Sequence, residues 1–309
     1  MTMAQPAGTT PGIKTWFLET RPQFLLLTPA CVLVGAGVAV YQTGTLNVFH
    51  FLLAFLGALL SHVSVNVLND YFDFKSGVDL KTKRTPFSGG SGILPAGLLK
   101  PKQVFLMGLV SLAGVIAIGG YFIYQYPLAI LPLGLIGVVV VYFYTTHITR
   151  DPFLCAIAPG LGFGPLMVLG TYVTQTGEYT LAAGIASLIP GFLVSNLLLL
   201  NQFPDVEADK IASRRHLPIT IGRRLSARVY VGLLGLTYLA LILAVSFQLL
   251  PLTALLGLAT VPLAVNAARG VLRNYDNIEG LIPFMGGNIL VTLLTPLLTG
   301  IGVLLGLLL

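Results

Sequence analysis

Two acidic segments of the 309-residue sequence repeat the same spacing of an asparagine and an aspartate. In the first segment, Asn69 precedes Asp73 by four residues. In the second segment, Asn201, Asp205 and Asp209 follow one another at the same interval. Four residues make about one turn of an α-helix, so each set should lie on one helix face. The offset along the chain is the same for both pairs, which suggests a weak internal repeat that places two acidic faces around one cavity.

The chemistry that these side chains suit is the binding of a hard divalent cation. Carboxylate and amide oxygens without a nearby set of His or Cys ligands fit Mg²⁺ better than zinc or copper. Mg²⁺ in proteins usually binds through one or two carboxylates together with substrate phosphates. Basic residues follow both segments and would complete a clamp for a diphosphate. They are Lys75, Lys81, Lys83 and Arg84 after the first segment, and Lys210, Arg214 and Arg215 after the second.

Several polar residues near these segments admit two interpretations each. The glycine-rich stretch 86–92 could contact phosphate through its amides or close over the cavity mouth. Arg21 is either an anchor at the membrane interface or a phosphate ligand. Tyr144 belongs to an aromatic group typical of the interface, and it could also shield a carbocation by cation–π attraction. Asp276 and Glu279 form either an ordinary loop or part of the cavity lining.

The histidines and cysteines favour structural roles. His62 is expected to be a hydrogen-bonded packing residue inside a helix. His147 and His216 are expected to be solvated, unless either reaches the cavity mouth. Cys31 and Cys155 both fall in apolar segments and are expected to be small core residues rather than a disulfide.

The elements that position these residues must cross a membrane. The chain is 55% hydrophobic and 9% charged, with a mean hydropathy of +0.89, whereas an ordinary soluble domain has about 25% charged residues. Windows without Asp, Glu, Lys or Arg, divided where Gly and Pro mark turns, predict nine spans of about 20 residues each. We therefore expect an all-α polytopic membrane protein of one domain, 1–309, with nine transmembrane helices around a central cavity. The spans are expected at 22–41, 47–70, 104–124, 128–147, 153–173, 181–203, 226–248, 251–269 and 282–308.

The basic residues predict an orientation for these spans. With nine spans, every Lys and Arg falls on one side, and Glu178 is the sole charge on the other. Short cytoplasmic loops carry an excess of Lys and Arg, so the charged side should face the cytoplasm. Residues 1–20 would then be a polar cytoplasmic tail, the loops 71–102 and 204–228 would cap the site, and the C-terminus would be exoplasmic. We expect an integral protein of a bacterial-type inner membrane, in contact with the lipid bilayer, whose pI near 9.4 reflects topology and not a nucleic-acid partner.

These motifs resemble the two aspartate motifs of the UbiA superfamily of intramembrane prenyltransferases, and the resemblance covers essentially the whole chain. The matching residues are Asn69, Asp70, Asp73, Asp79, Asp205 and Asp209.

Finer features look more like the menaquinone branch, whose members prenylate 1,4-dihydroxy-2-naphthoate. They are the six-residue step from Asp73 to Asp79, the Asn201 start of the second motif, Arg21 followed by a proline, and the run 162–172. The sequence departs from the family pattern at three places, which leaves the acceptor open. Those places are Ser213, His216 and the segment 142–150.

The resemblance implies transfer of a polyprenyl group from an allylic polyprenyl diphosphate donor to an aromatic acceptor, with 1,4-dihydroxy-2-naphthoate expected. It also implies Mg²⁺, as two ions bridging the diphosphate, and an apolar cavity for the isoprenoid tail. Asp70 adjoins Asn69 and would point elsewhere on the helix, so it ranks below the other ligands. The implied metal ligands are Asn69, Asp73, Asp79, Asp205 and Asp209; Lys81, Arg84, Lys210 and Arg215 would neutralise the diphosphate; and Asp73, Asp205, Arg21 and Tyr144 would be catalytic.

Other functions compete with this interpretation. Homogentisate, 4-hydroxybenzoate or a chlorophyllide-type acceptor would need similar motifs. A CDP-alcohol phosphatidyltransferase would carry one compact Asp-Gly-x-x-Ala-Arg signature, which the sequence lacks. A secondary transporter of an anionic substrate would place its binding residues near the bilayer midplane, whereas the acidic residues here gather at the ends of spans.

Overall fold

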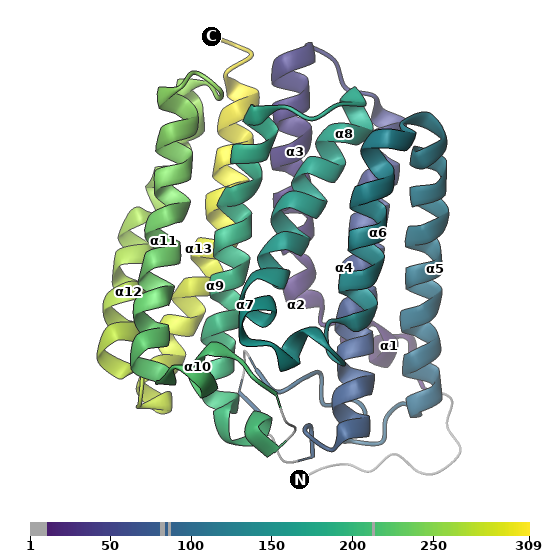
Figure 1. The fold of residues 1–309 in the computed structure, drawn as a ribbon, viewed down its shortest axis with the longest axis vertical. Coiled ribbons are helices and arrows are strands. Elements are labelled where there is room, and N and C mark those ends of the chain that lie inside the picture. The colour runs from purple at the N-terminus through teal and green to yellow at the C-terminus, as the bar shows by residue number, and fades with distance from the viewer. Residues whose placement is uncertain (1–10, 81–83, 86–87, 212–213) are drawn as a thin grey trace.

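The protein is a bundle of helices in the computed structural model, which describes residues 11–80, 84–85, 88–211 and 214–309 (Figure 1). The described part of the chain holds no strand. In chain order its elements are α1 Ile13–Glu19, α2 Pro22–Leu25, α3 Leu27–Thr43, α4 Val48–Ser76, α5 Pro101–Gln125, α6 Pro127–Phe143, η1 Ile148–Arg150, α7 Pro152–Leu161, η2 Gly162–Leu169, α8 Gly170–Thr176, α9 Leu181–Ile211, α10 Leu217–Thr220, α11 Gly222–Ser246, η3 Leu252–Thr260, α12 Val261–Asn274 and α13 Ile278–Leu305.

The helices have the lengths that a membrane protein needs. Within the described ranges, eight helical segments are long and apolar enough to cross a bilayer. The span predicted at 128–147 is α6, which has 17 residues and covers roughly 26 Å, slightly less than the ~30 Å of hydrocarbon. The prediction of an all-helical, polytopic membrane protein is confirmed, with α6 as the short member.

Two helices extend further than their apolar stretches predict. Helix α4 runs to Ser76 and α9 to Ile211, although their spans were expected to end near 70 and 203. The additional turns carry charged residues, of which Asp73 and Asp209 are buried and pair with Arg214, as ionisable groups at the end of a membrane span usually do. Gly77, with a φ of 80°, ends α4 in the left-handed conformation that glycine adopts without strain. The acidic motifs therefore lie on regular helical turns.

The segment expected as a polar tail contains a short helix, α1, with apolar side chains on its surface. Helix α1, which begins at Ile13, leaves the side chains of Ile13, Phe17 and Leu18 exposed. Trp16 packs on the other side, against a buried cluster that includes Val67 of α4. The chain then turns through Arg21, which has a φ of 55°, and enters α2 at Pro22.

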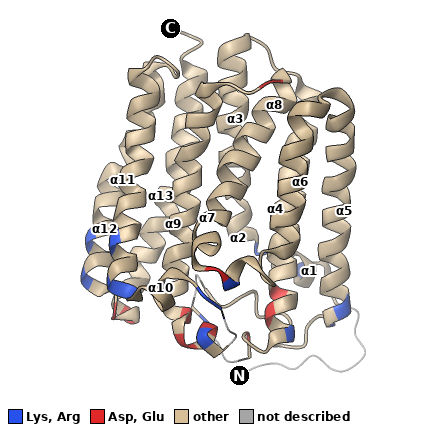
Figure 2. Cartoon of the chain, in the orientation of Figure 1, with Lys and Arg blue, Asp and Glu red and all other residues tan. Residues whose placement is uncertain are grey.

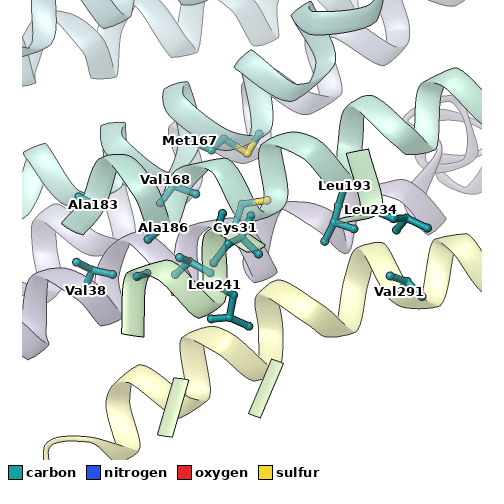
Figure 3. Packing of buried hydrophobic residues seen from close by; sticks show 14 of the residues in the cluster. Cys31, Val38, Met167, Val168, Ala183, Ala186, Leu193, Leu234, Leu241 and Val291 are labelled. Carbon is teal, nitrogen blue, oxygen red and sulfur yellow. The ribbon is translucent and has the colours of Figure 1, made fainter. Parts of the chain in front are cut away.

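Helix α9 lies at the centre of the bundle. In its most apolar window 72% of the residues are buried, compared with 22% for both α4 and α5. It packs against α3, α7, η2, α11 and α13. Figure 3 shows the core on its inner side, where Leu193 approaches residues of the neighbouring helices.

Glycines allow the close crossing of α7 and η2 over α9. A Cβ atom at Gly164 would lie 2.4 Å from the Ser187 carbonyl oxygen and 2.8 Å from the Gly191 Cα. A Cβ at Gly160 would lie 2.4 Å from the Gly191 carbonyl oxygen. Here the helix widens into the π-helical segment η2, which contains Pro165. This crossing fixes one wall of the cavity described below.

Charged residues gather at one end of the bundle (Figure 2). The lower ends of α4, α9, α11 and α12 carry the blue and red segments, and one red segment lies beside α8 at the opposite end. That segment is Glu178, which follows α8. The described chain begins at the charged end and finishes at the other (Figure 1).

Candidate active site

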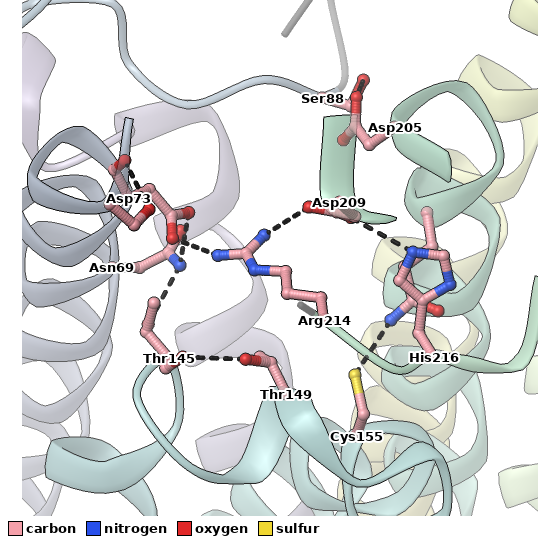
Figure 4. Close-up of polar contacts among 12 residues, drawn as sticks. Asn69, Asp73, Ser88, Thr145, Thr149, Cys155, Asp205, Asp209, Arg214 and His216 are labelled. Atoms are coloured by element: carbon pink, nitrogen blue, oxygen red, sulfur yellow. Dashed lines mark hydrogen bonds and ion pairs between the residues drawn. The ribbon is translucent and has the colours of Figure 1, made fainter. Parts of the chain in front are cut away.

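The acidic motifs of α4 and α9 face each other across the mouth of a cavity (Figure 4). On α4, the Asn69 amide nitrogen donates to Asp73 Oδ2 at 3.0 Å, as residues on one helix face can. On α9, Asp205 and Asp209 line the same mouth. Arg214 lies between the two sides and forms ion pairs with Asp73 and, at 2.9 Å, with Asp209 Oδ1.

The cavity behind this mouth is deep and apolar. Its volume is about 650 Å³. Along α4 its lining runs from Ala54 to Asp73, roughly 28 Å of helix, nearly the thickness of the hydrocarbon core. The interior is walled mostly by apolar side chains, among them Val115, Ile118 and Phe122 of α5, Ile130 and Leu133 of α6, and Leu166 of η2. The shape and polarity suit a long apolar molecule with an anionic head.

Arg21, which precedes α2, contacts the first motif. Its guanidinium donates to Asn69 Oδ1 at 3.0 Å and forms an ion pair with Asp70. Burial lowers the pKa of the Arg21 guanidinium, against the opposing effect of the Asp73 and Asp79 carboxylates. Asp70 is almost completely buried and does not line the cavity, which agrees with its expected direction on the helix.

Asp79 also lines the mouth, after the end of α4. Burial, with a smaller contribution from the Asp73 carboxylate, raises the pKa of Asp79 to about 7. A cation bound beside this carboxyl group would favour its ionised form.

The glycine-rich loop and Arg84 cover the mouth. The Arg84 guanidinium lines the cavity and donates to the carbonyl oxygens of Gly90 at 3.1 Å and Ser91 at 2.5 Å. Ser88 Oγ donates to Asp205 Oδ1 at 3.3 Å. The loop thus connects residues near the first motif with the second motif.

Two of the predicted phosphate ligands lie elsewhere, and a third is not among the described residues. Lys210 pairs with Glu207 at 3.2 Å on the exposed side of α9 and does not line the cavity. Arg215 is exposed and also absent from the lining. Lys81 lies outside the described residues, as do Lys83, Ser213 and positions 86–87.

Arg214 takes the place that the sequence suggested for Arg215. Burial lowers the pKa of the Arg214 guanidinium, but Asp73 and Asp209 outweigh that effect and hold the pKa above its usual range. Helix α9 ends at Ile211, so helical spacing no longer tells which of the following residues faces the site. Backbone hydrogen bonds fix the orientation of the two arginines. The Arg214 N–H donates to the Asp209 carbonyl, and the Arg215 N–H donates to the Thr149 carbonyl.

Tyr144 lines the cavity between the acidic mouth and the apolar interior. Burial raises the pKa of its phenol above the ordinary range, so the hydroxyl stays protonated. Neighbouring side chains not expected in the site support it. Thr145 Oγ1 accepts from the Asn69 amide at 3.0 Å, and in the cavity lining the Gln202 amide donates to Cys155 Sγ at 3.3 Å.

His62 and His216 are buried at the site, whereas the acidic pair Asp276 and Glu279 lies at the surface. His216 is buried, with Nε2 placed 3.1 Å from Asp209 Oδ2, so it supports the second motif. His62 Nδ1 is 2.9 Å from Thr28 Oγ1 between α3 and α4, and His62 also lines the cavity. Asp276 and Glu279 are exposed and do not line the cavity.

The donor set fits a hard cation that shares its coordination with a ligand. Among the described residues, no three His, Cys, Asp or Glu side chains cluster closely enough to hold a metal ion by themselves. Each side of the mouth instead presents one pair of oxygen-bearing side chains, Asn69 with Asp73 and Asp205 with Asp209. Mg²⁺ commonly binds in this way, through one or two carboxylates, with waters and phosphate oxygens as its other ligands.

Residues 29–290 match the UbiA prenyltransferase family. Related sequences include a 1,4-dihydroxy-2-naphthoate octaprenyltransferase of Bacillus subtilis, which is 27% identical over 85% of this chain and 83% of its own. The Escherichia coli enzyme of the same name is 27% identical over 94% and 95%. A 2-carboxy-1,4-naphthoquinone phytyltransferase of Synechocystis is 25% identical over 86% and 85%.

Solved structures share the fold. A digeranylgeranylglyceryl phosphate synthase superimposes with a TM-score of 0.67 at 19% identity, covering 94% of this chain and 98% of that one. A UbiA homologue of Archaeoglobus fulgidus bound to GPP and Mg²⁺ superimposes with a TM-score of 0.61 at 18% identity, covering 94% and 99%. At these identities the likeness establishes the arrangement of the helices.

Proposed function

The chain belongs to the UbiA prenyltransferase family and is a prenyltransferase of the membrane, and from that premise we propose that it prenylates 1,4-dihydroxy-2-naphthoate with an allylic polyprenyl diphosphate. One observation carries the proposal: a single deep cavity has an apolar interior and a mouth lined by both acidic and basic side chains. The names of the bacterial relatives, which are naphthoate octaprenyltransferases, support the choice of acceptor.

The diphosphate of the donor would bind at the mouth. Asn69, Asp73, Asp205 and Asp209, with Asp79 as a further ligand, would hold two Mg²⁺ ions against its oxygens. The metal supplies neutralising charge to the leaving diphosphate. Arg21, Arg84 and Arg214 line the same mouth and would add charge-assisted hydrogen bonds to the phosphate oxygens.

The polyprenyl tail would extend into the apolar cavity, which excludes water from the reacting carbon. The allylic C–O bond breaks and the diphosphate leaves with its electron pair. A ring carbon of the acceptor then bonds to the allylic carbon. In 1,4-dihydroxy-2-naphthoate that ring carbon bears the carboxylate, whose loss as CO₂ returns the electron pair to the ring. Tyr144 would lie beside the developing positive charge, where its ring face stabilises a cation.

The charged end of the bundle would face the cytoplasm of a bacterial-type inner membrane, with the C-terminus on the exoplasmic side. The concentration of Lys and Arg at that end (Figure 2) supports this orientation by the positive-inside rule. Both substrate heads would then enter from the cytoplasm.

The experiment that tests the proposal uses the purified protein and radiolabelled geranylgeranyl diphosphate, with Mg²⁺ or with EDTA. The acceptors are 1,4-dihydroxy-2-naphthoate, 4-hydroxybenzoate and homogentisate. We expect Mg²⁺-dependent labelling of the naphthoate alone, with release of CO₂. Labelling of another acceptor would overturn the proposed substrate while leaving prenyl transfer intact, and labelling that persists in EDTA would overturn the metal requirement.

A further inference from the structure

The loop 88–92 crosses the mouth and is held on both sides of it. On the α9 side, Ser88 Oγ donates to Asp205 Oδ1 at 3.3 Å. On the α4 side, the contacts converge on Ser91. The next residues, Ile93 and Leu94, are buried in an apolar cluster with Val67 of α4, so the far end of the loop is anchored by packing.

Two buried carboxylates hold Ser91. Its backbone N–H donates to Asp70 Oδ2 at 2.9 Å, and its hydroxyl donates to Glu19 Oε2 at 2.9 Å. The Glu19 side chain is 0% exposed and Asp70 is 1% exposed. Neither lines the cavity. Burying a carboxyl group is unfavourable unless it is paired or hydrogen-bonded, and both of these carboxyl groups direct an oxygen to the same serine.

Two glycines of the loop, on either side of Ser91, lie close to neighbouring side chains. Gly90 has a φ of 72°, and a Cβ atom there would lie 3.2 Å from Asp70 Oδ1 and 3.3 Å from Asp79 Oδ1. A Cβ at Gly92, whose φ is 74°, would overlap the Arg84 guanidinium. Both glycines have positive φ, a conformation that other residues adopt only with strain, and a side chain at Gly92 would have to displace the Arg84 guanidinium.

We propose that Glu19 and Asp70 are positioning residues that latch the loop 88–92 over the mouth through Ser91 and so keep water from the allylic carbon. The inference rests on the proposed prenyl transfer. Neither carboxylate would touch the substrate. Asp70 belongs to the first acidic motif but does not line the cavity, and it pairs with Arg21, which donates to Asn69. The latch therefore adjoins the proposed metal ligands without including them.

The latch decides which nucleophile meets the reacting carbon. When the allylic C–O bond breaks and diphosphate leaves, a ring carbon of the acceptor forms the intended product. With the loop displaced, a water oxygen bonds to the same carbon and loses one proton, which yields a prenyl alcohol. A loosened latch should therefore raise the ratio of prenyl alcohol to prenylated acceptor.

The first test measures the loop itself, by hydrogen exchange of the peptide containing residues 88–94 in the full-length protein. Glu19→Ala removes the contact with the Ser91 hydroxyl, and Glu19→Gln keeps an acceptor oxygen there. Ser91→Ala removes that contact and also the bond that the Ile93 N–H donates to Ser91 Oγ at 3.1 Å. We expect exchange roughly three- to tenfold faster in Glu19→Ala, as loss of one hydrogen bond allows, at least as fast in Ser91→Ala, and at the wild-type rate in Glu19→Gln. Ser111→Ala is the matched control, since its hydroxyl bonds only within α5 to the Met107 carbonyl.

The second test measures both products with geranylgeranyl diphosphate and the acceptor. The alcohol-to-product ratio should rise severalfold in Glu19→Ala and Ser91→Ala and stay at the wild-type value in Glu19→Gln and Ser111→Ala. Unchanged exchange in the alanine variants would overturn the latch, and faster exchange with an unchanged ratio would overturn its role in excluding water. If the wild type forms neither product, the proposed transfer fails, and the exchange data separately decide whether the two carboxylates hold the loop.

Discussion

At the scale of single residues, the site is organised by pairs of opposite charge. Asp73 on α4 and Asp209 on α9 approach each other with Arg214 between them. Two buried carboxylates facing each other would repel, and the guanidinium offsets that repulsion. The same group is placed to contact a diphosphate, because it lies between the two acidic pairs.

Replacing Arg214 should impair donor use far more than replacing its neighbour. We expect Arg214→Met to lower kcat/KM for the diphosphate by roughly 10²-fold, the usual cost of removing one charge-stabilising donor. Arg215→Met should stay near wild type, since Arg215 is exposed. Steady-state transfer assays on both variants check this, with elution on size-exclusion chromatography as the test of folding. Equal losses in the two variants would contradict the assignment.

The acidic pairs should be indispensable for turnover. We expect Asp73→Asn or Asp205→Asn to reduce transfer by roughly 10²-fold or more, because the amide cannot supply the negative charge that a cation requires. Asp276→Asn makes the same change on an exposed loop and should retain full activity. The comparison is made at saturating Mg²⁺, and full activity in both site variants would refute the ligand assignment.

Glu19 should make stability depend on pH. Burial raises its pKa from 4.5 to about 7, so the folded state keeps its proton where the unfolded state loses it. Stability from this group is therefore present at low pH and declines as the pH rises from about 4.5 to about 7. Glu19→Gln cannot ionise, so its melting temperature should exceed that of the wild type at pH 8 and match it near pH 4.5. A constant difference across this range would show that Glu19 is not protonated in the folded state.

The spacing of residues in the sequence predicted side-chain direction correctly on regular helices, but it could not predict side-chain direction in the loops. Asn69 and Asp73 share a face, as a step of four residues predicts, and Asp70 points away from the cavity. Arg214 and Ser91 follow helix ends or lie in loops, where no period relates side-chain direction to residue number. Their roles come from tertiary contacts, which one sequence does not display.

At the scale of elements, the acidic motifs are presented by the extended ends of α4 and α9. Apolar windows predicted where the spans lie, because the bilayer imposes a length on every helix. They did not predict the break between α2 and α3, the π-helical η2 or the 3₁₀ segment η3. These segments are as apolar as a regular helix, so hydropathy cannot separate them. The helical α1 was also missed, since its seven residues are too few for a clear period.

A side chain at Gly164, where η2 crosses α9, should destabilise the protein. Gly164→Ala would push a methyl group against the Ser187 carbonyl and the Gly191 backbone, and we expect a loss of about 1–3 kcal/mol. Gly162 lies in the same segment with no neighbouring atom within 4 Å of an added Cβ, so Gly162→Ala serves as the control. Melting temperatures in detergent compare the two. A Gly164→Ala protein as stable as Gly162→Ala would mean that the helices can separate at this crossing.

At the scale of the whole molecule, the cavity reaches from the charged end nearly across the bundle. Its depth belongs to no single helix, because α4, α5, α6 and η2 each supply part of the wall. The sequence indicated an apolar cavity through resemblance, and only the packing of the helices sets its size. The motifs likewise do not predict which acceptor binds, because the cavity lining that would contact it comes from several elements.

Filling the cavity should select against long donors. Gly119 lines the chamber and Gly120 does not, and an added Cβ at either position meets no atom within 4 Å. We expect Gly119→Phe to lower the rate with geranylgeranyl diphosphate by roughly tenfold while leaving dimethylallyl diphosphate nearly unaffected. Gly120→Phe should change neither rate. Competition between the two donors measures the selectivity, and an unchanged preference in Gly119→Phe would place the tail outside this chamber.

The single polar end of the cavity has a consequence for how a reaction cycle finishes. Under the proposed function, diphosphate would be released at the charged mouth and dissolve in water, whereas the prenylated ring, without its carboxylate, would lie at the depth of the acyl chains. The two products therefore leave into different phases. Product rebinding is then governed by concentration per unit of lipid, not per unit of bulk volume, so diluting the enzyme with additional lipid should relieve product inhibition while diluting the suspension with buffer should not.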